Sequence, residues 1–468
     1  MNQTNIYDVT QILENQKAAF LSDPYPSEKL RKQQLIALKK ALLKHKEKLV
    51  KAIEADFGSR STDESLIADI MPVVMSIDHA MKNLRNWMKP EKRKVTLMFQ
   101  PAKNRIFYQP LGVIGIMSPW NYPVLLSLGP LVASIAAGNR AIIKPSEFTP
   151  YANRVISEIL SDAFSNDEVS MVTGDAELAA DFSGLPFDHL LFTGSTEVGK
   201  LVMASAAKNL TPVTLELGGK SPAIIAPDVS AEFAVTRMLY GKCLNAGQTC
   251  VAPDYVLCPE AMLADLIESF KQQFKLLYPD IGNGDYTSVI NDPQHQRLQN
   301  WLKDAIDKGA EIISIGDVAG ELPRLMPLQL ILNSNETMSV MQQEIFGPLL
   351  PIVTYKNIDE AVAFVNTKSR PLALYLFTKD KNLETRILTH THAGGVCIND
   401  TASHVIQDDL PFGGVGSSGM GKYHAIEGFK TFSAAKSVLK KGVFYTASAA
   451  FPPYGKFIHK LIYRMLLN

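Results

Sequence analysis

The chain has 468 residues, of which 46% are apolar, and its 47 Lys+Arg residues balance its 47 Asp+Glu residues. This length and composition predict a globular protein of about three domains with a large core. With no net charge, the chain has no overall field that would attract nucleic acid or an anionic membrane, so we expect neither partner.

Four cysteines without a CxxC pair exclude a disulfide framework and a zinc site, and we expect no bound metal. Residues 1–16 have neither the basic nor the apolar region of a signal peptide. A reducing, cytoplasmic setting is therefore expected, in which a free thiol survives.

Two amphipathic surface helices are predicted at residues 29–55 and 63–88, because apolar residues recur there at helical spacing. The basic and polar stretch 90–104 predicts an exposed hairpin or linker. Residues 106–139 contain no charged residue and no histidine, which is long enough to cross a bilayer. Four prolines and four glycines interrupt this stretch, so a buried strand, a turn and a buried helix are expected instead of a membrane span.

Short apolar strands then alternate with helices. Strands are predicted at 113–117, 140–144, 170–173 and 189–192, and helices at 125–137 and 151–164. The pattern repeats with strands at 223–225, 255–257 and 394–398 and with helices beginning at Ala231 and Glu260. This alternation is typical of parallel α/β sheets, whose ligand sites lie at the carboxyl ends of the strands. We expect two such α/β domains.

Cys250 is the candidate nucleophile. Gly247 loosens the backbone ahead of it, and such a break can present a sulfur atom beside backbone N–H groups, where local positive potential lowers a thiol pKa. The alternative is a buried structural cysteine, since free Cys is among the most buried residue types. The other three cysteines, Cys243, Cys258 and Cys397, lack comparable flanks and are interpreted as core residues.

Two loops after predicted strands are candidate cofactor sites. Residues 193–200, TGSTEVGK, open a helical pattern, and Gly194 would let a pyrophosphate approach the helix N-terminus; an ordinary strand-to-helix turn is the alternative. A P-loop is disfavoured because Leu201 stands where it needs Ser or Thr. Lys144 and Glu147, separated by Pro and Ser, could bracket a ribose, or form a solvated charge pair. A GxGxxG at 414–419 follows no strand and predicts a tight loop.

Taken together, these stretches resemble the NAD(P)-dependent aldehyde dehydrogenase family, and most closely the coniferyl aldehyde dehydrogenases of its class 3-like branch. The matching stretches are PWNYP (119–123), KPSE (144–147), FTGSTEVGK (192–200), LELGGKSP (215–222), GQTC (247–250), EIFGP (344–348) and PFGGVGSSGMGKYH (411–424). They follow the family's order along nearly the whole chain. One departure is Ala425, where relatives often have Gly.

The resemblance implies a role for each matching residue. It implies that Cys250 is the nucleophile, Glu216 the general base, and the Asn121 amide with the Cys250 N–H the oxyanion hole. It further implies that the cofactor is bound by Trp120, Lys144, Ser146, Glu147, Gly194, Ser195, Thr196, Gly199, Glu344 and Phe346. The implied activity is oxidation of an aromatic or phenylpropenyl aldehyde, such as coniferyl aldehyde, to its acid through a cysteine thioester, with hydride transfer to NAD or NADP.

The resemblance also implies the fold: a Rossmann-like cofactor domain, an α/β catalytic domain and a small β oligomerisation arm. The cofactor domain would comprise 1–88 and 109–215, the catalytic domain 216–400, and the arm 89–108 and 401–440, with 441–468 as a C-terminal tail. A homodimer formed through the arm is expected. NAD is the expected cofactor, because the Glu147 carboxylate would repel the 2′-phosphate of NADP.

Three other functions remain open at this point. A CoA-acylating dehydrogenase would pass the acyl group to a thiol, but Glu216 would then have no water to activate. A cysteine hydrolase would use a histidine base, yet no papain-like or caspase-like signature surrounds Cys250. A non-catalytic NAD-binding relative would not need all three catalytic groups.

The tail has apolar residues at helical spacing over 457–467, with Lys460 and Arg464 between them. This segment is too short to span a bilayer. We interpret it as a helix docked on its own subunit or on a partner subunit. Interfacial membrane binding is the alternative.

Overall fold

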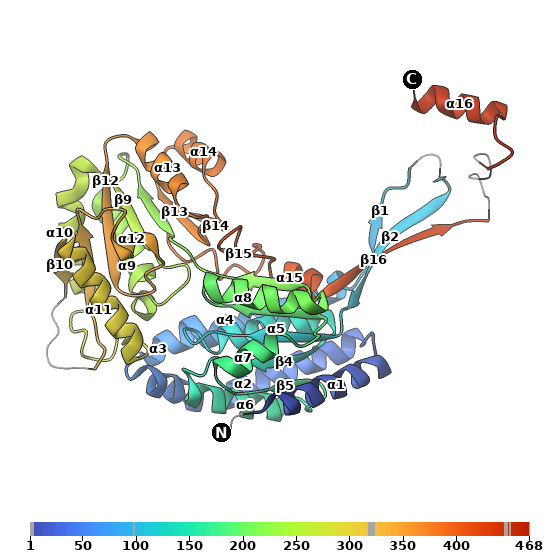
Figure 1. Ribbon diagram of the computed structural model, residues 1–468, viewed down its shortest axis with the longest axis horizontal. Coiled ribbons are helices and arrows are strands. Elements are labelled where there is room, and N and C mark those ends of the chain that lie inside the picture. The colour runs from blue at the N-terminus through green and yellow to red at the C-terminus, as the bar shows by residue number, and fades with distance from the viewer. Residues whose placement is uncertain (1–3, 97–98, 317–322, 444–447, 449–450, 468) are drawn as a thin grey trace.

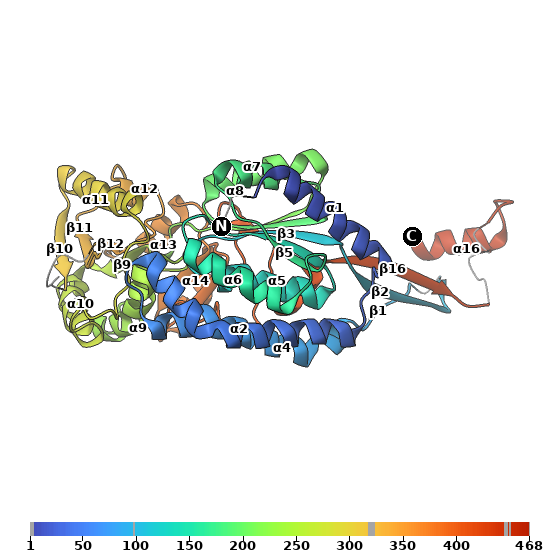
Figure 2. The same cartoon turned by 90° about the horizontal axis from the view of Figure 1, so that it is seen from below.

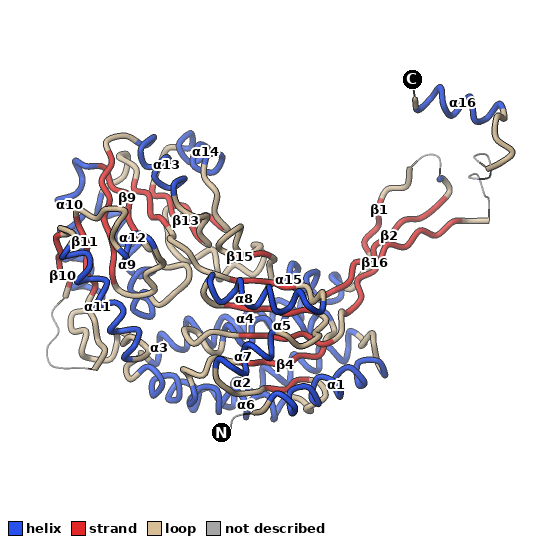
Figure 3. Tube along the Cα trace, in the orientation of Figure 1, coloured by secondary structure: helices blue, strands red, loops and turns tan. Residues whose placement is uncertain are grey.

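The computed structural model describes residues 4–96, 99–316, 323–443, 448 and 451–467. Two large sheets with flanking helices form the body, and a small three-stranded sheet projects from it (Figure 1). Figure 3 shows the strands in red and the helices that pack around them in blue. The α/β class predicted from the sequence is confirmed.

The first sheet has six strands in the order β15-β7-β6-β3-β4-β5, and only β15 runs antiparallel to its neighbour. The strands are β3 (Val113–Met117), β4 (Arg140–Lys144), β5 (Val169–Met171), β6 (His189–Thr193), β7 (Val213–Glu216) and β15 (Gly419–Met420). Side chains of β3 alternate between two apolar clusters, with Ile114 and Ile116 in one and Val113 and Met117 in the other. Both faces of this sheet are therefore buried, as parallel sheets require.

Helices cover both faces of the six-stranded sheet (Figure 2). One face carries α1 (Ile6–Ser22), α7 (Ala176–Ser183) and α8 (Thr196–Ala206). The other face carries α5 (Leu125–Ala137) and α6 (Pro150–Ala163), and outside them α2 (Glu28–Phe57) and α4 (Met71–Trp87). A short helix α3 (Thr62–Ser65) and a π-helical turn (Leu66–Ile70) lead into α4. The two amphipathic helices predicted near the N-terminus are confirmed.

The second sheet has seven strands in the order β10-β11-β12-β9-β8-β13-β14, and only β10 is antiparallel. The strands are β8 (Pro222–Ile225), β9 (Tyr255–Pro259), β10 (Glu311–Ile315), β11 (Leu328–Leu332), β12 (Leu349–Tyr355), β13 (Ala373–Phe377) and β14 (Gly395–Ile398). Its helices are α9 (Ala231–Cys243), α10 (Leu263–Leu277), α11 (Asp292–Asp307), α12 (Ser339–Gln342), α13 (Ile358–Thr367) and α14 (Lys381–His390).

Several element boundaries differ from the sequence prediction by a few residues. The strand predicted at 170–173 is Val169–Met171, and the helix predicted from Glu260 begins with a 3-10 turn (Glu260–Met262) ahead of α10. The uncharged stretch 106–139 forms the end of β2, then β3 and α5, and its interior side chains are buried as expected. Within the described part of the chain, no helix has both the length and the apolar character of a membrane span.

The projecting sheet is antiparallel and contains β1 (Glu91–Arg93), β2 (Ala102–Pro110) and β16 (Ser433–Lys441). The hairpin expected at 90–104 therefore belongs to this arm. The remainder of the predicted arm, 401–432, lies elsewhere: β15 joins the six-stranded sheet, and α15 (Ala425–Thr431) packs on α4 and α5. A glycine makes the β15 contact possible, because a Cβ on Gly419 would lie 2.0 Å from the Leu215 carbonyl oxygen.

The tail forms helix α16 (Phe457–Leu466), as its spacing predicted. Both ribbon views show this helix beyond the end of the arm, away from the body (Figures 1 and 2). Phe457 and Met465 on its apolar side are 82% and 66% exposed. Docking of this helix on its own subunit is therefore not seen.

Candidate active site

The loops that the sequence singled out leave the six-stranded sheet at one edge. Met117, the last residue of β3, pairs with Lys144 on one side and with Phe192 on the other, and Thr193 pairs with Glu216. The carboxyl ends of these four strands therefore lie side by side. Because β4 and β6 follow β3 on opposite sides, this edge is a topological switch point, where parallel α/β sheets bind ligands.

Cys250 comes to the same place from the part of the chain that forms the second sheet. After α9, a 3-10 turn (Leu244–Gly247) holds Asn245 and Ala246 at φ values of 52°, and this left-handed turn reverses the chain. The backbone N–H groups of Cys250 and Val251 are near the Cys250 sulfur and act to lower its pKa. The Asn121 side chain reaches this loop and donates from Nδ2 to the Gln248 carbonyl oxygen at 3.1 Å.

Two cavities meet at Cys250. One has a volume of about 770 Å³ and runs along the strand ends, lined by Trp120, Ser195 and Glu344 among others. The other has a volume of about 140 Å³ and is lined mainly by apolar and aromatic side chains. Cys250 lies on the walls of both cavities, so its sulfur can contact two different ligands at once.

The structure brings most of the predicted site residues to the larger cavity. Its walls include Trp120, Asn121, Gly194, Ser195, Thr196, Glu216, Cys250, Glu344 and Phe346. Gly199 is buried behind it in α8, and Lys144, Ser146 and Glu147 lie off its walls. Lys144 Nζ is 3.5 Å from Glu147 Oε2, so the two side chains form an ion pair with each other, and burial lowers the pKa of Lys144.

The electrostatic environment of Cys250 differs from the sequence prediction. A positive potential was expected to lower its pKa, but burial raises the pKa of this thiol to about 12, and the nearby Glu344 and Glu216 carboxyls add to the rise. Only the two backbone N–H groups act in the opposite direction. The free protein therefore holds Cys250 as a thiol at neutral pH, and a base has to remove its proton. Of the other cysteines, Cys397 is only half-buried, not a full core residue.

Glu216 is a buried carboxyl at the end of β7, and neither of its oxygens has a hydrogen-bond partner in the described part of the chain. Burial raises the pKa of Glu216 well above its ordinary value, while Lys422 acts against the rise. A carboxyl with a raised pKa and free lone pairs is suited to accept a proton near neutral pH.

Glu344 lies against the glycine pair that follows β7. A Cβ on Gly218 would lie 2.1 Å from both Glu344 oxygens, and the Gly219 N–H donates to this carboxyl. Burial raises the pKa of Glu344 to about 8, and Asp254 adds to the rise. Gly218 is thus required for the carboxyl to sit at the cavity wall, while Gly219 has a φ of +131° that favours glycine.

Several lining residues were not predicted from the sequence. Arg297 and Trp301 come from α11, with the guanidinium 4.5 Å from the indole ring centre, and Lys368 follows α13. The sequence of α11 has the pattern of an ordinary amphipathic surface helix, so no local signal distinguishes these residues. Only the packing of α11 beside the second sheet brings them to the cavity.

The smaller cavity has an aromatic lining. Trp87, Tyr122, Phe412 and Tyr423 contribute rings, and His424 stacks on Phe412 with ring centres 4.9 Å apart. Burial lowers the pKa of His424 to about 4, so its imidazole is neutral. A largely aliphatic wall that also carries several rings favours an apolar ligand and can stack on a planar one.

Comparison with known proteins gives this geometry a family. The sequence model described as "Aldehyde dehydrogenase family" matches residues 2–438. The chain belongs to the aldehyde dehydrogenase family. It is 50% identical to a probable coniferyl aldehyde dehydrogenase of Pseudomonas aeruginosa, over 100% of this chain and 98% of the relative. It is 45% identical to a coniferyl aldehyde dehydrogenase of a Pseudomonas species, over 96% and 94% of the two chains.

Solved structures agree with this assignment. The substrate-bound state of Staphylococcus aureus AldH superimposes with a TM-score of 0.93 at 38% identity, covering 99% of this chain and 100% of the other. A Mycobacterium tuberculosis aldehyde dehydrogenase complexed with NAD+ gives a TM-score of 0.86 at 26% identity, with 95% and 92% covered. The resemblance predicted from the motifs is confirmed. The chain is an NAD(P)-dependent oxidoreductase that converts an aldehyde to a carboxylic acid.

The larger cavity fits a dinucleotide. It is long and partly polar, and Ser195 begins α8 at its wall, so the positive end of the helix dipole faces the space where a pyrophosphate would lie. Thr193 Oγ1 is buried without a hydrogen-bond partner in the described residues. The N-terminus of α8 suits a bound anion, and the Thr193 hydroxyl is suited to form a hydrogen bond with the same ligand.

We predict that alkylation of Cys250 by iodoacetamide depends on pH without a plateau in the neutral range. Because the raised pKa keeps the thiol protonated, the thiolate fraction and the second-order rate should rise about ten-fold per pH unit between about pH 7 and 10. Mass spectrometry of the free protein against the Cys250→Ala variant gives the site-specific rate. A plateau below about pH 9 would contradict the raised pKa.

Proposed function

We propose that this enzyme oxidises aromatic aldehydes of the phenylpropenyl type, such as coniferyl aldehyde, with Cys250 as the nucleophile. The observation that carries the proposal is the position of the Cys250 sulfur between an aromatic cavity and a cavity suited to a dinucleotide. The names of the relatives from Pseudomonas support the same substrate class.

A substrate panel tests this choice. Coniferyl aldehyde, benzaldehyde and a medium-chain aliphatic aldehyde would be compared by kcat/KM from NADH absorbance. Coniferyl aldehyde should have the highest value, since its planar, apolar body matches the ring-lined cavity. A higher value for the aliphatic aldehyde would refute the proposed substrate class without affecting the assignment to the family.

The proposed chemistry has an acylation and a deacylation. The Cys250 thiol first loses its proton to solvent, and the sulfur forms a bond to the aldehyde carbon while the C=O π bond breaks. The oxygen that becomes negative is stabilised by Asn121 Nδ2, which has a second proton besides the one donated to Gln248, and by the Cys250 N–H. NAD(P)+ held in the larger cavity would supply the acceptor for the hydride that leaves this carbon. A thioester remains on Cys250.

Glu216 then takes a proton from water, and the water oxygen attacks the thioester carbon. The C–S bond breaks, the acid leaves, and the proton returns to the sulfur or to solvent. The buried position and raised pKa of Glu216 support this role, and its two unpartnered oxygens are free to hold a water molecule. The same features argue against a CoA-acylating enzyme, where a thiol replaces water.

For the cofactor, we propose that Gly194, Ser195, Thr196 and Gly199 hold the pyrophosphate at the start of α8. The remaining predicted residues would hold the rings and riboses: Trp120, Lys144, Ser146, Glu147, Glu344 and Phe346. Phe346 and Trp120 support each other, since their rings meet edge-on with centres 5.3 Å apart. In this proposal, the six-stranded sheet forms the cofactor domain and the seven-stranded sheet the catalytic domain.

We predict that Glu216→Gln releases NADH in one rapid burst of about one equivalent and then stalls. Gln is nearly isosteric but cannot accept a proton from water, so the thioester forms and accumulates. The steady rate should fall by about 10²–10⁴-fold, the scale of general-base catalysis. Rapid-mixing absorbance with saturating NAD+ and aldehyde measures both phases.

The matched control is Cys250→Ala, which should show no burst because no covalent bond forms. If Glu216 also removes the thiol proton, the burst of Glu216→Gln slows but keeps its amplitude. If Glu216→Gln had the steady-state rate of the parent enzyme, Glu216 would not be the group that activates water. The CoA-acylating alternative, in which a thiol accepts the acyl group, would then gain support.

We predict that NAD+ is preferred over NADP+ and that Glu147→Gln narrows the difference. The carboxylate would accept hydrogen bonds from the ribose hydroxyls and repel a 2′-phosphate. The ratio of the two kcat/KM values in the parent and the variant measures the effect. Equal values for both cofactors in the parent would rule out the repulsion.

We also propose a homodimer, built through the arm. Among the described strands of this sheet, β16 pairs with β2 alone and has mostly exposed side chains, which suits its outer edge for pairing with another strand. The exposed apolar side of α16 would pack on the partner subunit. Light scattering should give twice the chain mass, and removal of residues 454–468 should weaken the dimer; a monomer at working concentration would contradict this.

The free thiols support a cytoplasmic location.

A further inference from the structure

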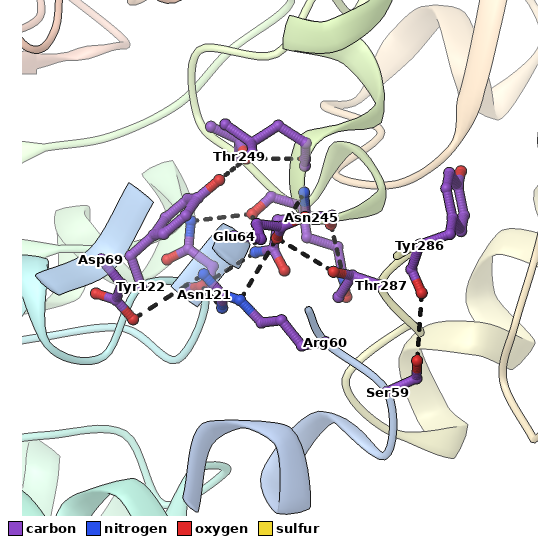
Figure 4. A network of polar contacts seen from close by, with 12 residues as sticks. Ser59, Arg60, Glu64, Asp69, Asn121, Tyr122, Asn245, Thr249, Tyr286 and Thr287 are labelled. Atoms are coloured by element: carbon purple, nitrogen blue, oxygen red, sulfur yellow. Dashed lines mark hydrogen bonds and ion pairs between the residues drawn. The ribbon is translucent and has the colours of Figure 1, made fainter. Parts of the chain in front are cut away.

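Arg60 is a fully buried arginine beside the catalytic loops, and the proposed chemistry gives it no role. It lies in the turn between α2 and α3, and its side chain has 0% exposure. Figure 4 shows its guanidinium pointing toward Asn121 and Glu64. A charge without access to water is costly unless it is paired, so its contacts indicate what holds it there.

The first contact is with the residue proposed to hold the oxyanion. Arg60 Nη1 donates to the Asn121 carbonyl oxygen at 2.8 Å, and Asn245 Nδ2 donates to the same oxygen at 3.0 Å. Asn245 Nδ2 also donates to the Gln248 carbonyl oxygen at 3.1 Å, the same atom that accepts from the Asn121 amide. The Asn245 amide thus donates both to the backbone of Asn121 and to the Cys250 loop, and this fixes the distance between the two loops.

The second contact is with the aromatic ring next to Asn121. The guanidinium carbon lies 5.0 Å from the centre of the Tyr122 ring, and the ring of Phe57 lies 4.8 Å away. The Tyr122 hydroxyl forms a 2.8 Å hydrogen bond with Thr249 Oγ1, and Thr249 precedes Cys250. Arg60 therefore supports the Cys250 loop through Tyr122 as well as through Asn245.

Two carboxylates hold Arg60 in this position. Its Nε is 3.4 Å from Glu64 Oε1, and its Nη2 is 4.0 Å from Asp69 Oδ2. Glu64 accepts from the Asn245 N–H and the Thr287 hydroxyl, each at 3.1 Å. Asp69 accepts from the first N–H groups of α5, which follow the Asn121 loop directly. Each carboxylate thus binds Arg60 and one of the two loops that Arg60 connects.

We infer that Arg60 is a positioning residue for acylation, which sets the distance between the Asn121 amide and the Cys250 sulfur. The inference rests on the proposed roles of Asn121 and Cys250. A preorganised oxyanion donor is typically worth about 10²–10³ in rate, and a misplacement of about 1 Å can remove much of that. Arg60 itself lines neither cavity, so it acts through the wall residues Asn121 and Tyr122 and through the Cys250 loop.

Arg60→Lys is the informative substitution. Lysine keeps the charge that Glu64 and Asp69 require, but a single ammonium group cannot replace the planar fork that binds the Asn121 carbonyl and stacks on Tyr122. The rate constant of the NADH burst should fall about 10- to 100-fold. The burst amplitude and the affinity for NAD+, measured by quenching of tryptophan fluorescence, should stay within about two-fold, because the pyrophosphate loop is untouched.

A double-mutant cycle separates positioning from a purely structural role. If Arg60 acts by aiming the Asn121 amide, Arg60→Lys should change the burst rate less than about two-fold when Asn121 is already Ala. Arg31→Lys is the matched control. Arg31 is equally buried, stacks on Tyr25 and donates to the carbonyls of Pro26, Ala136 and Ala137, at the opposite end of α5. It should lower the melting temperature and leave the burst rate unchanged.

Three outcomes decide the matter. An equal loss from Arg60→Lys with and without the Asn121 amide overturns the inference and leaves the proposed function standing. If Asn121→Ala has the same NADH burst rate as the parent enzyme, the inference and the proposed oxyanion role of Asn121 are both overturned, because the Asn121 amide then does not assist acylation. If Arg60→Lys does not fold, Glu64→Gln loosens the ion pair isosterically, and its milder loss should likewise vanish in the Asn121→Ala background; an unchanged loss there overturns the inference.

Discussion

The central constraint on this molecule is that three acidic groups are buried around one point. Burial raises the pKa of the Cys250 thiol and of the Glu216 and Glu344 carboxyls, and the two carboxyls add further to the rise at Cys250. In a low-dielectric region such groups cannot all be ionised together. In the free protein these three groups therefore tend to keep their protons, and the reaction requires proton transfers to and from them in a defined order.

This constraint explains why the site is built from the segments of both large sheets. A single sheet edge would expose these groups to water, and their pKa values would return toward the ordinary range. Here the strand ends of the six-stranded sheet supply Asn121 and Glu216, while the second domain supplies Cys250 and Glu344. Closing the two against each other buries the sulfur but leaves one cavity open on each side of it.

A network of buried charges near the N-terminus holds the Asn121 loop and the Cys250 loop in a fixed relative position. The N-terminal helices contribute Arg60, Glu64 and Asp69, which bind the Asn121 loop, the start of α5 and the Cys250 loop. Such a charge network is a weak source of stability, because desolvation offsets most of its attraction. Part of its geometry is specific, however, since Arg60 Nη1 donates to the Asn121 carbonyl oxygen and each carboxylate accepts from backbone N–H groups. Arg60 Nε and Nη2 make ion-pair contacts but no hydrogen bond within the described residues. Stability of the fold and alignment of the reacting groups are therefore separable properties.

The sequence by itself determined the α/β class, the two long N-terminal helices and most of the strand positions, because those depend on local apolar periodicity. It also identified Cys250, Glu216, Asn121 and the glycine loops, since GQTC, LELGGKSP and PWNYP are local strings that match the family. None of this required knowing which segments touch.

Tertiary structure decided everything that depends on burial or on distant contacts. The raised pKa of Cys250 follows first from burial and then from the Glu344 and Glu216 carboxyls, which are distant in the sequence, so no local pattern could show it. Arg297 reaches the cavity from a helix whose sequence pattern predicts a solvent-facing surface, and β15 leaves the predicted arm to pair with β7. Arg60 shows the same limit most clearly: in the sequence it is one arginine in a polar turn, and only folding removes it from water and places it against Asn121, 61 residues away.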